Sequence, residues 1–354
     1  MSKYRANGLP WASGIGKDVS DCRYAEEVMQ KANLDFYVSK CDLISKMPFA
    51  INGDNNIDEK LGEFSKDGYI YRNCPNAYGT YRTDINVPLG LVKAKYEVIQ
   101  NIEAFNFFND AIGEGKAQWD RAGMFGYGHK IFVSAKLPTT ITVGNDKIDN
   151  YLVFSNSHDG SSSINILFSP IRVICTNMLN SAIHSTDSYI RIRHTQTAKE
   201  KLERGAEILR IACEHAKTAE QLYNSLLTIK MTDDQVMKYI ANLQLNDAER
   251  AALENYDPKN GIKKLFSKDY LTMESTNISV RKANAIINMF EYYIDGIGQK
   301  DIAGTAWGAY NAVTGFYSNV ANLEGEKRVD SLLYGGASRN MNKALNEAIN
   351  YKVA

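Results

Sequence analysis

The residues best suited to chemistry are cations in the middle of the chain. They are Lys130, Arg172, Arg191, Arg193, His194 and Lys199. Residues 121 to 204 carry ten Lys/Arg and six Asp/Glu, a net charge of +4 (10 − 6), whereas the whole chain balances 41 basic against 41 acidic residues. A protein that wraps nucleic acid with its whole surface is usually basic overall. The composition therefore predicts a local anion-binding surface.

Hydrogen-bond donors and aromatic rings accompany these cations. The donors that could reach phosphate oxygens are Asn156, Ser157, His158, Ser161 and Ser162. The aromatic residues are Phe125, Tyr127 and Tyr189, which could stack on bases. Cations that follow the backbone and rings that tolerate any base are what a groove for a single strand requires. The pattern predicts such a groove, and the alternative is a set of surface arginines paired with acidic helices.

The elements that must position these residues are read from residues 151 to 195. Tyr151–Phe154 and Ile164–Phe168 are expected to be strands, joined by the polar turn 157–163, in which Gly160 can take a positive φ. Ser169 and Pro170 have the types of an N-cap and a first helical residue, so a helix is expected there with Arg172 in its first turn. Residues 188–194 alternate, which places Arg191 and Arg193 on one face of a strand.

The wider pattern predicts an α+β protein with a central antiparallel sheet, flanking helices and a mostly helical C-terminal region. We expect residues 1–195 to form the sheet-containing core and residues 196–354 to form helices packed on it. Those helices are expected to begin at Thr197 and to follow near 232–243, 246–255, 279–295, 302–322 and 324–354.

No catalytic or metal-binding motif emerges. No two of the five histidines lie three or four residues apart, so no helical metal pair is present, and no phosphate-binding glycine loop occurs. His158 and Asp159 are adjacent; a loop-stabilising pair is favoured over an acid–base pair, because no nucleophile motif accompanies them. We therefore expect a non-catalytic protein without cofactor.

The location expected is the cytoplasm of a bacterial host. The five cysteines are odd in number and widely spaced, which favours a reducing compartment. The N-terminus lacks the apolar stretch of a signal peptide, and no run is long enough to cross a bilayer, so no membrane partner is expected.

The combined series SNSHDGSSS, SPIRVICTNML and IRIRHT, with LGLVKAKYEVIQNIEAFNFF upstream and TAWGAYNAVTGF downstream, resembles a family of uncharacterised phage- and plasmid-borne proteins. The resemblance covers most of the chain and implies a mobile-element context. It also implies a structural similarity to single-strand-annealing recombinases.

Together these observations predict a phage or plasmid protein that binds single-stranded DNA, with annealing of complementary strands by a homo-oligomer as an extension. Three alternatives stay open. The protein could act on a host protein as a takeover or anti-defence factor, it could be a hydrolase with a His158/Asp159 site, or it could be a structural assembly protein.

Overall fold

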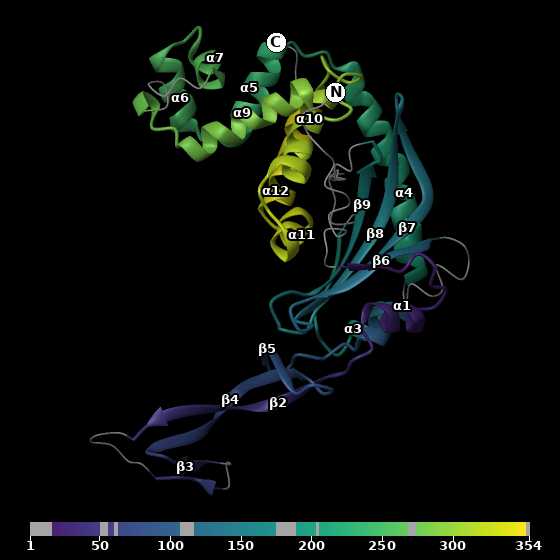
Figure 1. The fold of residues 1–354 in the computed structure, drawn as a ribbon, viewed down its shortest axis with the longest axis vertical. Coiled ribbons are helices and arrows are strands. Elements are labelled where there is room, and N and C mark those ends of the chain that lie inside the picture. The colour runs from purple at the N-terminus through teal and green to yellow at the C-terminus, as the bar shows by residue number, and fades with distance from the viewer. Residues whose placement is uncertain are drawn as a thin grey trace.

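The computed structural model describes residues 16–49, 56–59, 63–106, 117–174, 189–202, 205–267 and 274–351. Its centre is a six-stranded antiparallel sheet in the order β1-β6-β7-β8-β9-β10 (Figure 1). The strands are β1 (Gly16–Asp18), β6 (Gln118–Phe125), β7 (Lys130–Val143), β8 (Asp146–Ser157), β9 (Ile164–Arg172) and β10 (Tyr189–Ile192). The expected α+β class is confirmed, and the predicted turn between residues 157 and 163 joins β8 to β9.

Both faces of this sheet are covered, so its central strands are apolar on both sides. Ile131, Val133 and Phe154 belong to the core that includes α1 (Ala25–Ala32) and α4 (Gly205–Thr228). Their neighbours along β7 and β8 alternate to the opposite face. There Phe132 and Val153 pack on α11 (Gly325–Leu333) and α12 (Gly336–Ile349).

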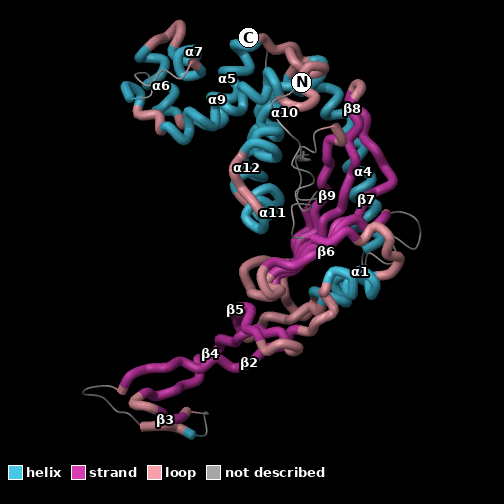
Figure 2. The backbone as a smooth tube through the Cα atoms, in the orientation of Figure 1, coloured by secondary structure: helices cyan, strands magenta, loops and turns pink. Residues whose placement is uncertain are grey.

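A second sheet projects from the body as an arm (Figure 2). It contains β2 (Val38–Pro48), β3 (Phe64–Lys66), β4 (Tyr69–Arg82) and β5 (Val87–Lys93). The strand β4 pairs with β2 along one edge and with β3 and β5 along the other. We call the part formed by residues 39–49 and 63–78 the β-arm.

The β-arm is attached to the body by a close approach of two backbones. A Cβ atom added to Gly90 would lie 2.4 Å from the carbonyl oxygen of Asp159, and one added to Gly160 would lie 2.8 Å from that of Leu91. Gly160 also has a φ of +75°, which L side chains rarely adopt. Thr80 completes the joint by donating from its hydroxyl to the carbonyl oxygen of His158 at 2.6 Å. The glycines let β5 lie directly on the β8–β9 turn.

The elements described after β10 are helical. They are α3 (Ala198–Leu202), α4, α5 (Asp233–Gln244), α6 (Asp247–Tyr256), α7 (Gly261–Phe266), α9 (Val280–Asp295), α10 (Ala306–Gly315), η2 (Phe316–Val320), α11 and α12. Thr232 and Asn246 form capping boxes and Ser279 accepts a capping hydrogen bond, as these residue types predict. The single helix expected over 324–354 is divided at Tyr334 and Gly335 into α11 and α12.

One expected element is wrong. Residues 169–172 do not start a helix, because β9 continues to Arg172 and pairs with β8, with Ser169 opposite Tyr151 and Pro170 opposite Asn150. The strand β10 pairs only with residues 164–167, so the missing N–H of Pro170 interrupts no ladder bond with β10. The remainder of the expected helix, residues 175–188, lies outside the described residues.

Arg172 is consequently a structural residue. It is fully buried and donates to both carboxylate oxygens of Asp146, at 2.9 and 2.8 Å, and to the carbonyl oxygen of Gly298 at 2.7 Å. Trp307 of α10 also donates to Asp146, at 3.2 Å. This network ties the far end of the sheet to the helical region and is inaccessible to a ligand.

We predict that Arg172→Ala lowers the free energy of unfolding by about 3–5 kcal/mol, because it leaves the Asp146 carboxylate buried without its cation. Urea denaturation followed by circular dichroism measures the loss. The control is Lys136→Ala, which breaks the more exposed pair with Asp149 and should cost less than about 1 kcal/mol. Equal losses in the two variants would contradict the role assigned to Arg172.

Candidate nucleic-acid interface

A small cleft opens where the β8–β9 turn meets α11. Its cavity measures about 250 Å³. One wall is polar and consists of Ser155, Ser157, Ser161, Ser162, Ser163 and Asn165. The other is apolar and consists of Phe125, Phe132, Val329 and Leu333. We call this cavity the serine cleft.

Asp159 shapes the polar wall. Its Oδ1 accepts hydrogen bonds from the Ser157 hydroxyl at 2.5 Å and from the Ser161 backbone N–H at 2.9 Å. The Ser157 hydroxyl in turn accepts from the Ser162 N–H at 3.2 Å. Burial opposes ionisation of Asp159, but the hydrogen bonds from Ser157 and Ser161 outweigh it and hold the pKa of this carboxyl below its ordinary value. The turn is therefore a fixed hydrogen-bonded unit around an ionised carboxylate.

Three of the predicted cations lie at the mouth of the serine cleft or on the strand beside it. The Arg191 Nε donates to the Ser163 hydroxyl at 3.1 Å, and the Lys130 Nζ lies 3.4 Å from the Asp330 carboxylate of α11. Arg191 and Arg193 are exposed, whereas Ile192 between them is 3% exposed. The alternation predicted for this segment is confirmed, with both arginines on the open face.

Three other predicted residues turn away from the cleft. Asn156, His158 and His194 are buried, and their side chains contact the segment 96–101 instead. The ring of His158 bonds to the amide oxygen of Asn101 at 2.8 Å, and that of His194 stacks on Tyr96 with centroids 4.4 Å apart. In this structure these three side chains are therefore engaged with the segment 96–101 and are not presented to the cleft.

Two further predicted cations pair with carboxylates away from the serine cleft. Arg172 is buried with Asp146 at the opposite end of β9, which corrects its assignment to the site. Lys199 of α3 is exposed, but its amine lies 2.6 Å from the Glu103 carboxylate, which raises the pKa of Lys199 through that hydrogen bond. The predicted set thus divides: Lys130, Arg191 and Arg193 lie at the mouth of the cleft or beside it, whereas Ser157 is buried in the cleft wall and bonded to Asp159.

The aromatic residues divide in the same way. Phe125 is buried and packs on Phe132 with centroids 5.6 Å apart, so its expected stacking role is wrong. Tyr127, in the turn between β6 and β7, is 62% exposed and offers a free ring face. The side chain of Tyr189 lies outside the described residues.

Two residues of the cleft gave no signal in the sequence. Asp330 faces Lys130 across 200 positions of chain, and Tyr334 donates from its hydroxyl to the Ser155 hydroxyl at 2.8 Å. Asp330 belongs to α11 and Tyr334 is the C-cap residue directly after it, and the apolar residues of α11 pack on the sheet. Only the packing of the helix brings them to the cleft.

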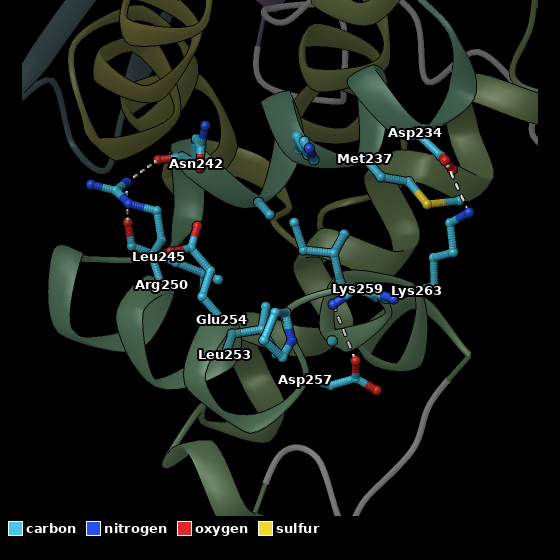
Figure 3. Close-up of a pocket in the computed structure, with 15 residues that line it drawn as sticks. Asp234, Met237, Asn242, Leu245, Arg250, Leu253, Glu254, Asp257, Lys259 and Lys263 are labelled. Carbon is cyan, nitrogen blue, oxygen red and sulfur yellow. Dashed lines mark hydrogen bonds and ion pairs between the residues drawn. The ribbon is translucent and has the colours of Figure 1, made fainter.

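A larger cavity of about 450 Å³ lies among α5, α6 and α7 (Figure 3). Lys263 is paired with Asp234 at 2.9 Å, and Arg250 donates to the carbonyl oxygens of Asn242 and Leu245. These cations are thus engaged by the cavity's own wall. Arg191 and Arg193 beside the serine cleft are exposed at the edge of the sheet, and we therefore place the candidate site there.

The described residues contain no cluster of three or more side chains able to hold a metal ion. No helix in that part of the chain is long and apolar enough to span a membrane.

The fold and the site together define an α+β protein that carries a cationic edge strand beside a polar cleft. The chain belongs to the family described as a domain of unknown function (DUF932), which matches residues 88–349. The match covers the six-stranded sheet from β6 onward and the helical region, and it excludes the β-arm. Nothing among curated proteins and nothing among solved structures matches the chain.

The buried histidines predict a pH dependence of stability. Burial, reinforced by the nearby His194, lowers the pKa of His158 to about 3, and burial also lowers the pKa of His194. Since the unfolded histidines titrate near 6.5, the unfolded chain binds more protons than the folded one below that pH. Stability is therefore complete above pH 6.5 and falls as the pH drops toward 3, by up to about 1.4 kcal/mol per pH unit for His158, with a further loss from His194.

Urea denaturation at pH 7.5, 6 and 5 measures this slope. His158→Gln keeps a polar group near Asn101 and removes one titration, so its stability should fall less steeply between pH 6.5 and 5. An unchanged slope in the variant would show that His158 is not held neutral in the folded protein.

Proposed function

We propose that the protein binds single-stranded DNA along β10 and the mouth of the serine cleft. The observation that carries the proposal is the exposed pair Arg191 and Arg193 beside this cleft. On a strand that rises about 3.3 Å per residue, the two side chains emerge about 6.6 Å apart on one face. They can hold successive phosphates of an extended strand.

The neighbouring groups suit the same ligand. Serine hydroxyls donate to phosphate oxygens, and Lys130 adds a third cation at the mouth. The exposed Tyr127 supplies a ring for stacking, which serves any base. A site of this kind reads the backbone and tolerates sequence, as single-strand binding requires.

A binding role without a chemical step also fits the placement of His158 and Asp159. The histidine ring bonds to Asn101, whereas the carboxylate accepts from Ser157 and Ser161. The two side chains therefore have separate partners, and each is accounted for by holding the turn in place. This favours the loop-stabilising interpretation over the hydrolase alternative.

We extend the proposal to annealing of complementary strands by an oligomer in a phage or plasmid context. Cations that hold phosphates leave the base edges free to pair with a second strand. A chain with no net charge can carry this local cationic surface without repelling its own copies over the rest of the surface.

A second candidate function is binding to a host protein. The specific observation in its favour is the β-arm, whose tip exposes large apolar side chains. It predicts a stoichiometric partner that copurifies from host cells independently of nucleic acid.

The first test removes the two arginines. Arg191→Ala combined with Arg193→Ala should weaken binding of a fluorescent oligonucleotide and reduce the slope of log K against log salt by about 1.4, because two phosphate contacts of roughly 0.7 each are lost. Fluorescence anisotropy at several salt concentrations measures both effects.

The matched control is Arg281→Ala combined with Lys300→Ala, which removes two exposed cations from the helical region and leaves the overall charge change the same. The control should bind as the unmodified protein does. Equal affinity and slope for the arginine variant would exclude β10 from the site.

A second test increases the affinity. Asp330→Asn removes the carboxylate that pairs with Lys130, so the lysine becomes available to phosphate and the local charge rises. We expect tighter oligonucleotide binding and a steeper salt dependence in the same anisotropy assay. Weaker or unchanged binding would place Lys130 outside the nucleic-acid contact.

A further inference from the structure

The β-arm has almost no buried side chains. Of its described residues between 39 and 78, only Ile70 is buried. Several large apolar side chains are instead 38–47% exposed, namely Ile44, Met47, Phe49, Phe64 and Tyr69. Ribbons of a few strands are marginally stable unless a hydrophobic face is covered. An extended surface of this kind, projecting from the body (Figure 2), is typical of an interaction site.

The strand β2 is the open edge of this arm. It pairs with β4 on one side, and no described strand pairs with its other side. The Gln100 side chain closes the base of that edge, because it accepts from the Val38 N–H at 3.0 Å and donates to the Val38 carbonyl at 2.9 Å. The backbone carbonyl of Tyr37 points to the opposite side of the strand, because it accepts from the Thr83 N–H at 3.0 Å.

This alternation determines which backbone N–H and C=O groups of β2 can pair with another strand. Backbone groups of successive strand residues point to opposite sides. The register between β2 and β4 shifts between Asp42 and Ile44. The extra residues belong to β4, where residues 74–77 stand opposite Leu43 alone. The alternation of backbone groups along β2 therefore continues past Leu43. The outward backbone groups beyond Val38 are therefore those of Lys40, Asp42, Ile44 and Lys46.

These outward residues fit a second copy of the same strand in one register. An antiparallel pair centred on Asp42 opposes two aspartates, and one centred on Lys46 opposes two lysines. A pair centred on Ile44 places Ile44 against itself and Asp42 against Lys46 twice, which is attractive. Pro48, which has no N–H, would stand opposite Lys40 and end the ladder there.

We propose that two copies of the protein associate through β2, antiparallel, about a two-fold axis at Ile44. The two arms then form one continuous sheet, and the apolar side chains at each arm tip meet the partner's arm. The interface is self-complementary, as a two-fold dimer requires. It lies outside the region matched by the family and does not depend on nucleic-acid binding.

Cysteine cross-linking tests the register. In a background with Cys41→Ser and Cys74→Ser, Ile44→Cys places two thiols directly opposite each other. A hydrogen-bonded antiparallel pair has a Cα separation of about 5.5 Å, within the range of a disulfide. We expect mild oxidation without DNA to give a covalent dimer on a non-reducing gel.

Asp42→Cys in the same background is the matched control, because its two copies would be offset by four residues, roughly 13 Å. It should remain largely uncross-linked. Equal cross-linking at both positions, or none at Ile44→Cys, would overturn the proposed register.

Charge exchange tests the dimer itself by light scattering. Asp42→Lys alone and Lys46→Asp alone each convert two attractive pairs into repulsive ones, so the dimer should weaken roughly tenfold or more. The double variant restores opposite charges and should restore the dimer.

A protein that is monomeric at every concentration tested, or single variants that dimerise as well as the double variant, would overturn the proposal. If the protein is monomeric, a host protein that copurifies with it in a fixed ratio through the β-arm would be the partner of β2 in place of a second copy. Oligonucleotide binding measured on the same variants separates this result from the nucleic-acid proposal, because β2 and β10 do not share residues.

Discussion

The structure depends on one contact, the approach of the β5 backbone to the turn between β8 and β9. Gly90 and Gly160 allow it because a side chain at either position would collide with the facing backbone. Thr80 and the Tyr96 hydroxyl then hold the carbonyls of His158 and Ser157, each at 2.6 Å. This contact fixes the serine turn on one side and the direction of the β-arm on the other. Both proposed surfaces therefore originate from a single joint.

The polar layer behind this joint explains why so many candidate residues are structural. Asn101 bridges the Leu34 carbonyl and the His158 ring, while Asn156 donates to the Ile99 carbonyl. Buried polar groups are stable only when they are hydrogen-bonded, so these side chains are committed to each other. Neutral histidine is part of this arrangement, since burial of the His158 ring disfavours its charged form. The cations that remain open are those at the edge of the sheet, where Arg191 and Arg193 are exposed among the described residues.

The two proposed surfaces separate recognition from assembly. Arg191 of β10 donates to Ser163 of the serine cleft and Arg193 directly follows β10, whereas β2 belongs to a projecting arm (Figure 1). Charge drives the first contact, so it should respond to salt. Backbone pairing and apolar burial dominate the contact between two β2 strands, so this contact should depend less on salt. A dimer joined through its arms would carry two such cationic edges on one particle and could hold two strands at once.

The sequence by itself determined the local features. The turn with Gly160, the helix starts near Thr232, Asn246 and Ser279, and the alternation of Arg191, Ile192 and Arg193 are confirmed because each depends on residues a few positions apart. Only the tertiary structure decided that Arg172 is buried against Asp146 and that Lys130 pairs with Asp330. Ser169 and Pro170 are suitable for a helix start, but pairing with β8 and burial against Asp146 outweigh that local preference. Asp330 reaches Lys130 because α11 packs on the sheet, and such non-local contacts leave no periodic trace in the chain.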